Sequence, residues 1–274
     1  RSSRNDSPSG ARTLLPGMAH AGIMPCSFAK KTGATTGRVV SRNVFRPIGK
    51  SLHAGTAEAD GVPHHVTQRG NRRQRTFFGT DDYALYQALL AEHARARGVA
   101  VWAWCLMPNH VHLVLVPAEA GSLAAALGEA HRRYSRHINF REGWRGYLWQ
   151  GRFASCALDE PHLLTAVRYV ELNPVRARLV GRPEDWPWSS ARAHLRGEED
   201  GLTAPSPLPA LVPDWAAFLD EAPPAAALEA LRTGERTGRP LGSRTFVAAL
   251  EVQLGRRLRP GKPGPRPAGK RTDG

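Results

Sequence analysis

The sequence predicts an α+β fold: an antiparallel sheet in the ferredoxin-like order β-α-β-β-α-β, followed by one more helix. Three observations predict it. Residues 110–116 are apolar or β-branched apart from two histidines, and residues 99–106 are rich in β-branched and aromatic residues, as strands are. Capping residues open two helical segments. The tight turn Met107-Pro-Asn joins the second strand to the third.

The individual elements follow from local signals. The expected strands are 64–69, 99–106, 110–116 and 153–158. The first helix is expected over 81–97, with Thr80 or Asp81 as its cap. The second helix begins at the cap Ser122 and runs towards Asn139. Helices then cover one face of the sheet, and the other face is expected to be free.

A further helix is expected to begin near Pro161, because proline is favoured in the first turn of a helix. Its buried stripe consists of Leu163, Leu164, Val167 and Val170. At about 100° per residue, His162, Tyr169 and Asn173 lie on a different side of this helix. Pro174 then ends or kinks it. Tyr169 and Asn173 are one turn apart, so one helix would bring a phenol and an amide oxygen to the same point.

Two histidines share one face of the 110–116 strand. Side chains alternate along a strand, so His110 and His112 face the same way and the apolar residues between and after them pack on a core. With Asn173 they would make a mixed nitrogen and oxygen set that suits Mg²⁺ or Mn²⁺. On spacing alone, a His-x-His strand is more often a half-exposed polar face, and a Tyr and Asn on one helix are more often interface residues.

Five motifs occur in a fixed order between residues 61 and 195. They are His64-His-Val-Thr-Gln-Arg-Gly-Asn, Cys105-Leu-Met-Pro-Asn-His-Val-His, Trp149-Gln-Gly-Arg-Phe, Tyr169-Val-Glu-Leu-Asn-Pro-Val-Arg-Ala and Trp186-Pro-Trp-Ser-Ser. In these motifs the chain resembles the REP-associated tyrosine transposases. That family consists of single-tyrosine HUH proteins similar to the small transposases of single-strand insertion sequences.

The resemblance implies a role for each predicted site residue. His110 and His112 would bind the metal, Asn173 would complete the metal site, and Tyr169 would be the nucleophile. The implied reaction is metal-dependent cleavage and strand transfer of single-stranded DNA through a 5′-phosphotyrosine. A free phenol has a pKa of about 10, so attack at neutral pH requires either that something favours its anion or that the phosphorus is made more electrophilic, as Mg²⁺ or Mn²⁺ would do. Tyr134 is the rival tyrosine, on what is expected to be an outward helix face touching DNA.

The charge of the chain indicates a nucleic-acid partner. A formal net charge of +14 and a pI ≈ 10.7 favour binding to phosphate, with an affinity that falls with salt. The residues expected to contact DNA are Arg69, Arg72, Arg73, Arg75, Arg132, Arg133, Tyr134, Arg136, Trp149 and Arg152. Arginines for phosphates and aromatics for unstacked bases suit single-stranded or hairpin DNA. The resemblance implies that this DNA is a hairpin of the repetitive extragenic palindromic kind. The alternative to nucleic-acid binding is that the basic residues form a solvated surface without a partner.

Composition divides the chain into three parts. Residues 1–60 lack sustained periodicity and are expected to be disordered, and residues 61–195 are expected to form the HUH tyrosine transposase domain. Residues 196–274 are expected to form a linker, short helices and a basic C-terminal arm that lies along DNA phosphates. The first part is rich in Arg and Ser, like a targeting peptide, but lacks the apolar core of a secretory signal.

The apolar stretches, the cysteines and the glycine-rich segments of the sequence limit which partners and which cell compartment are expected. The sequence has no apolar stretch of membrane-spanning length, and its 3 cysteines do not form a disulfide framework, so a reducing cytoplasm is expected. It also has no Gly-rich nucleotide-binding loop, so no nucleotide cofactor is expected. A homodimer, in which the tyrosine helix serves the partner's histidines, stays open.

Two classes of function remain. The preferred one is an enzyme: a transposase-like, metal-dependent single-strand DNA endonuclease and strand transferase. The alternative is a domesticated protein that holds repeat hairpins without cutting them. Such a binder would not need to keep His110, His112, Tyr169 and Asn173 together. A relaxase or replication initiator of the wider HUH group would normally bring a helicase or a larger origin-binding domain.

Overall fold

The computed structural model describes residues 58–259, which all lie within the unit that spans residues 51–274. Residues 1–57, on which the predicted disordered segment falls, lie outside the described part of the chain. The same holds for residues 260–274, which carry most of the predicted basic arm. The fold below is therefore that of residues 58–259.

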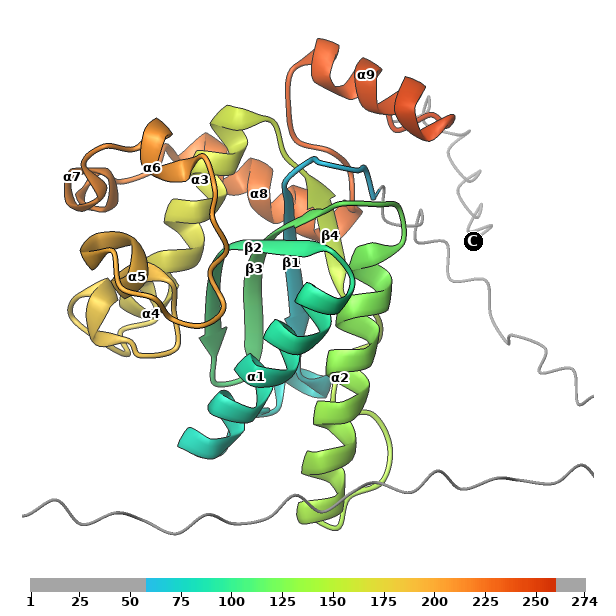
Figure 1. Ribbon diagram of the computed structural model, residues 1–274, viewed down its shortest axis with the longest axis vertical. Helices are drawn as coiled ribbons and strands as arrows, with labels where there is room; N and C mark the ends of the chain where they lie inside the picture. Colours follow the sequence, from blue (N-terminus) through green and yellow to red (C-terminus); the bar gives the residue numbers. More distant parts are fainter. Residues whose placement is uncertain (1–57, 260–274) are drawn as a thin grey trace, which may run out of the picture. The chain divides into compact units, whose positions relative to one another are not determined.

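A four-stranded antiparallel sheet forms the centre of the fold (Figure 1). Its strands are β1 (His64–Arg69), β2 (Val99–Met107), β3 (His110–Pro117) and β4 (Ala154–Ala157), in the spatial order β2-β3-β1-β4. Every neighbouring pair is antiparallel. The first six elements follow the order β-α-β-β-α-β, and a helix comes next. The predicted fold class is confirmed.

The helices begin and end close to where local signals place them. They are α1 (Thr80–Ala96), α2 (Ser122–Arg141), α3 (Glu160–Glu171), α4 (Asn173–Arg176), α5 (Ala191–Arg196), α6 (Leu208–Leu211), α7 (Trp215–Asp220), α8 (Ala225–Thr237) and α9 (Arg244–Leu254). Short 3-10 turns are η1 (Asn71–Arg73) and η2 (Pro183–Asp185). The Asp159 side chain caps α3 by accepting from the His162 N–H. The predicted cap Ser122 is instead the first helical residue, after Gly121 in a left-handed conformation.

Helices cover both faces of the sheet. On one face α1 and α2 pack against Val66, Val111 and Leu113 (Figure 1). On the other face, which carries the histidines, α3 and α8 pack with Val114 and Cys156. The expectation of a free histidine face is therefore wrong. Residues beyond 195 supply the additional cover, because α8 and its buried Leu231 belong to the apolar cluster on this face.

The Trp186-Pro-Trp-Ser-Ser motif occupies the outer edge of β2. The indole of Trp186 donates to the Leu106 carbonyl (3.0 Å), and the Leu106 N–H donates to the Trp188 carbonyl (2.9 Å). The Trp104 N–H donates to the Ser190 hydroxyl (3.0 Å). Backbone groups at a sheet edge must be paired when they are buried, and this motif pairs them.

A buried carboxylate fixes the C-terminal end of α3. Glu171 accepts hydrogen bonds from the Ser190 hydroxyl (2.6 Å) and the Trp215 indole (2.8 Å), and its Oε1 lies 2.5 Å from Nδ1 of His194. These partners come from two segments after α3: Ser190 and His194 belong to the beginning and the middle of α5, and Trp215 begins α7. The network therefore holds the end of α3, and with it Tyr169, against the rest of the domain.

We expect Glu171→Ala to lower the free energy of unfolding by about 3 to 5 kcal/mol, because it leaves three buried polar groups without their partner. Urea denaturation followed by circular dichroism measures the change. Glu198→Ala, at an exposed carboxylate near the end of α5, is the control and should change stability by no more than about 0.5 kcal/mol. Equal stabilities of the two variants would contradict the assignment of this network.

Among the described residues, no helix has the length and apolar character needed to span a membrane.

Candidate active site

Three aromatic side chains predicted from the sequence to belong to the site meet on the face of the sheet that α3 and α8 cover. The ring centroids of His110 and His112 are 4.9 Å apart, and that of Tyr169 on α3 is 5.4 Å from His112. His110 and His112 share a face because they are two residues apart on β3. Tyr169 is 8% exposed and points from α3 towards that strand. The structure thus brings together the phenol and the two imidazoles.

A third histidine joins them. His65 on β1 pairs with Val114 of β3, which places its side chain on the same face as His112. Nε2 of His65 lies 3.1 Å from Nδ1 of His112, and the two rings are stacked with centroids 5.3 Å apart. Sequence reasoning missed His65, because the register between β1 and β3 decides which residues become neighbours.

The three imidazoles are neutral at physiological pH. Burial lowers the pKa of His65 to about 4 and that of His110 to about 3, and it holds the pKa of His112 well below its usual range. The positive charge of Arg176 acts in the same direction on all three. A neutral imidazole keeps one free nitrogen lone pair, which is the form that binds a metal ion.

Asn173 does not lie on the same helix as Tyr169. Helix α3 ends at Glu171, and Asn173 is the first residue of α4. Pro174 has no N–H with which to continue the α3 hydrogen bonds, so the helix breaks before it. The expectation of a single helix is therefore wrong. Asn173 is nevertheless buried, and its role as a metal ligand stays a prediction.

Arg176 lies over the ring of Tyr169. Its guanidinium carbon is 3.8 Å from the ring centroid, and Nη1 donates to the Tyr169 carbonyl (3.1 Å). That carbonyl is one of those left without an intrahelical partner at the end of α3. Desolvation lowers the pKa of Arg176 from its ordinary value. Sequence reasoning missed this residue, although it lies two helical turns after Tyr169 within the same motif.

One cluster of described residues has the composition of a metal site: His65, His112 and Glu235, whose ligand atoms all lie within 4.8 Å of one another. Glu235 belongs to α8, and burial raises its pKa. Glu235 was not predicted, because the contact between α8 and the sheet depends on packing between segments that are distant in sequence. The available signal was the amphipathic spacing of Leu228, Leu231 and Glu235.

The arginine-rich loop after β1 lies at the end of the sheet where β3 begins. Arg72 and Arg73 are exposed and adopt left-handed backbone angles (φ 52° and 62°). The Asn109 side chain donates to the Arg73 carbonyl (2.9 Å), which ties the loop to the residue before His110. Strained backbone of this kind is found at functional sites. Arg69, on the last position of β1, is paired with His110 across the ladder.

Helix α2 carries the second predicted basic cluster. Arg132, Arg133 and Arg136 are exposed, and the first two form ion pairs with Glu129. Tyr134 is 0% exposed, and its hydroxyl donates to the Thr76 carbonyl (2.7 Å). The prediction that Tyr134 contacts DNA from an outward face is wrong, since the residue packs on α1 and the 76–78 segment. Burial also raises the pKa of Tyr134, which makes it a poor nucleophile.

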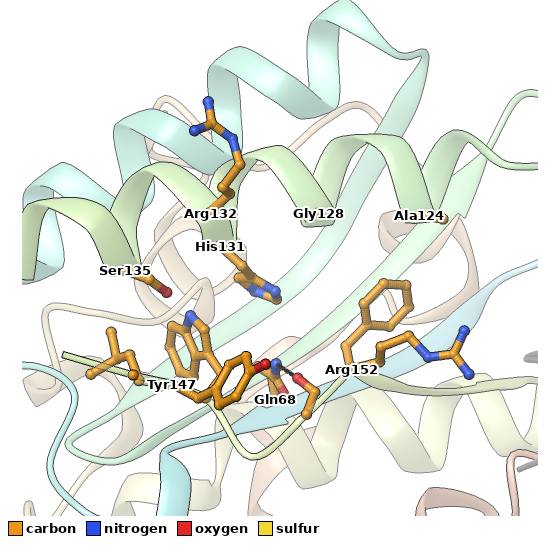
Figure 2. Close-up of a pocket in the computed structure, with 13 residues that line it drawn as sticks. Gln68, Ala124, Gly128, His131, Arg132, Ser135, Tyr147 and Arg152 are labelled. Atoms are coloured by element: carbon orange, nitrogen blue, oxygen red, sulfur yellow. Dashed lines mark hydrogen bonds between the residues drawn. The ribbon is translucent and has the colours of Figure 1, made fainter. Parts of the chain in front are cut away.

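Predicted contact residues also line a cavity of ≈ 410 Å³ between α2, β1 and the 146–153 loop (Figure 2). Its walls include Gln68, His131, Tyr147, Trp149 and Arg152. Tyr147 is 86% exposed, whereas the Trp149 side chain is buried. Figure 2 shows His131 directed from α2 towards Gln68, and Arg132 directed away along the outside of the helix. The cavity therefore combines aromatic walls with an arginine and an amide.

Comparisons with known proteins support the family resemblance predicted from the five sequence motifs. Residues 60–173 match the family model described as "Transposase IS200 like". A REP-associated tyrosine transposase of Haemophilus influenzae is 26% identical over 118 residues, which is 39% of this chain and 65% of that protein. One from Escherichia coli is 22% identical over 120 residues, 43% of this chain and 70% of that protein. The chain thus matches less than two thirds of the Haemophilus protein.

A solved structure of a REP-associated tyrosine transposase bound to a REP hairpin is 23% identical. It covers 54% of this chain and 88% of the other, with a TM-score of 0.44. The resemblance predicted from the five motifs is confirmed by the family model and by the two curated relatives.

Proposed function

We propose that this chain, whose residues 60–173 match the IS200-like transposase family model, cuts and rejoins single-stranded DNA at palindromic hairpins. One observation carries the proposal. The phenol of Tyr169 comes from α3, whereas the two imidazoles come from β3, and the rings of Tyr169 and His112 lie 5.4 Å apart. The proposed nucleophile and the two proposed metal ligands therefore come from segments distant in sequence and lie close together.

The residues present fit a divalent cation. Neutral His110 and His112 offer free nitrogen lone pairs, and the amide oxygen of Asn173 is a hard ligand. We assign these three residues to hold Mg²⁺ or Mn²⁺. When bound, the cation would polarise the scissile phosphodiester and offset its negative charge.

Tyr169 performs the attack in this proposal. Its Oη forms a bond to phosphorus while the bond to the 3′ oxygen breaks, which leaves a 5′-phosphotyrosine and a free 3′-hydroxyl. The phenolic proton is lost, and the 3′ oxygen gains a proton. The guanidinium of Arg176 above the ring stabilises negative charge on the attacking phenol. The phosphotyrosine keeps the energy of the phosphodiester, so a second hydroxyl can reverse the step and join strands.

The arginine loop and the cavity would bind the DNA. Arg72 and Arg73 lie in the loop tied to Asn109, at the end of the sheet where His110 begins β3. Their positive charges suit phosphates on either side of the scissile bond. The cavity walled by Tyr147 and Trp149 suits an unstacked base, because aromatic faces stack on bases of any sequence.

Incubation with a single-stranded repeat hairpin from the flank of its own gene tests this function. The hairpin is labelled on the 3′ side of the expected nick, and a denaturing gel follows. We expect a covalent protein–DNA adduct with Mn²⁺ and none with EDTA. Salt-sensitive binding without any adduct would favour the domesticated binder, for which the burial of Tyr169 is the supporting observation.

The double variant Arg72→Gln/Arg73→Gln is expected to weaken hairpin binding and to flatten its salt dependence. Removing two phosphate contacts should reduce the slope of log K against log salt by about 1.4 to 1.8. Fluorescence anisotropy at several salt concentrations measures the slope. Arg95→Gln/Arg97→Gln is the matched control, since both arginines lie at the C-terminal end of α1, just before β2 and away from the loop after β1. A slope equal to that of the control would remove the loop from the interface.

A further inference from the structure

We propose that His65, His112 and Glu235 form a divalent-cation site that links helix α8 to the sheet. The proposal goes beyond the proposed function, because Glu235 lies outside residues 60–173 and the site can be tested without DNA. Two nitrogen ligands and one carboxylate suit Mn²⁺, Co²⁺ or Zn²⁺ better than Mg²⁺ or Ca²⁺.

The distances between the ligand atoms carry the proposal. Oε1 of Glu235 lies 3.8 Å from Nδ1 of His65 and 3.8 Å from Nδ1 of His112. Nε2 of His65 is 3.1 Å from Nδ1 of His112. Ligands at about 2.0 to 2.2 Å from one ion are separated by somewhat more than 3 Å in tetrahedral geometry. The two separations of 3.8 Å are close to this spacing, so shifts of Glu235 and the two imidazoles would bring the carboxylate and both Nδ1 atoms around one cation. The contact between Nε2 of His65 and Nδ1 of His112 would open in the same movement.

Unsatisfied polar atoms point to the same place. Nδ1 of His65 and Oε1 of Glu235 are both buried and have no hydrogen-bond partner. His65 itself is 1% exposed. A buried polar atom without a partner costs free energy. Nδ1 of His65 and Oε1 of Glu235 face each other, so a ligand between them would remove this cost for both atoms. A cation would satisfy both atoms.

The packing of α8 holds Glu235 at this position. Gly234 is buried, and a Cβ there would lie 2.9 Å from Leu241 and 3.0 Å from the Cys156 sulfur. A glycine thus lets α8 approach β4 closely, next to the residue that reaches the histidines. Leu231, one turn earlier, is fully buried against the same face. The carboxylate is therefore delivered by a docked helix and not by a free side chain on the surface.

His112 is common to this site and to the proposed pair with His110. A neutral imidazole has one free lone pair, so His112 serves only one of the two positions at a time. The Glu235 site is thus an alternative position for the ion, reached through Nδ1 of His112. It requires His65 and Glu235, whereas it does not require His110 or Asn173.

Titration of the metal-free full chain with Co²⁺ tests the site, with visible absorption and calorimetry as the readouts. Because the proposed site of His110, His112 and Asn173 would also take Co²⁺, the variants are compared in a His110→Ala background, where one Co²⁺ is expected with the absorption of a nitrogen- and oxygen-liganded ion. Loss of a second-shell partner costs about 10- to 100-fold in metal affinity, so loss of the direct ligand in Glu235→Gln should cost about 100-fold or more. Glu229→Gln is the matched control, because Glu229 lies on the same helix with a 59% exposed side chain.

Two further variants keep the test decisive. In the same background, His65→Gln removes a ligand from a different element and should lose Co²⁺ as Glu235→Gln does, whereas Asn173→Ala should retain it. Circular dichroism without metal confirms that each variant is folded. Binding by Glu235→Gln that equals binding by Glu229→Gln would overturn the proposal, as would the absence of Co²⁺ binding by the unchanged protein.

The outcome of the Co²⁺ titration is independent of the outcome of the DNA cleavage test. Glu235-dependent Co²⁺ binding without a DNA adduct would count against the proposed function alone. A metal-dependent adduct together with Co²⁺ binding that ignores Glu235 would count against this site alone.

Discussion

The Tyr169→Phe variant is expected to form no covalent adduct with hairpin DNA and to bind the hairpin as tightly as the unchanged protein. Phenylalanine keeps the ring that packs beside His112 and under Arg176, and it removes only the oxygen that attacks phosphorus. Loss of a nucleophile abolishes the covalent step, whereas it leaves the phosphate contacts of the arginines in place. The denaturing gel reports the adduct, and fluorescence anisotropy reports the binding.

Tyr83→Phe is the matched control for this prediction, because Tyr83 lies on α1, on the other face of the sheet, and has no part in the proposed site. This variant should form the adduct at the rate of the unchanged protein. An adduct that persists in Tyr169→Phe would move the nucleophile elsewhere.

The second large effect is expected at Arg176. Arg176→Ala should slow adduct formation by about 100- to 1,000-fold, the range typical of removing one group that stabilises charge in a transition state. Two contacts support this: the guanidinium stacks on the Tyr169 ring, and it also donates to the Tyr169 carbonyl. Single-turnover kinetics with Mn²⁺ measure the rate.

Arg176→Lys separates charge from geometry. Lysine keeps the positive charge but loses the planar group that stacks and donates at the same time, so it should restore only part of the rate. Arg196→Ala, at an exposed arginine of α5, controls for the loss of net charge. A uniform loss of hairpin affinity in Arg176→Ala with an unchanged rate of attachment would assign Arg176 to phosphate binding instead.

The helices and strands of residues 61–195 could largely be predicted from local sequence. The strand with His110 and His112, the turn before it and the helix with Tyr169 lie where alternation, capping and proline placed them. These signals act between residues close in sequence, so the sequence records them directly. The predicted roles of His110, His112, Tyr169 and Asn173 stay predictions.

The neighbours of the site could not be predicted in the same way. His65 reaches His112 through the register of β1 against β3, and Glu235 reaches both through the docking of α8. The length and apolar content of α8 alone do not say which face of the sheet it covers. The prediction for Tyr134 was wrong for a related reason. Its basic neighbours suggested an exposed helix face, whereas its own side chain is buried against α1.

The most direct test of the central claim is identification of the residue that carries the DNA. The adduct formed with Mn²⁺ is digested with protease and nuclease, and the modified peptide is sequenced by tandem mass spectrometry. The account predicts a nucleotide attached through its 5′ phosphate to the phenol oxygen of Tyr169. Attachment at another residue, such as the exposed Tyr147, would contradict it.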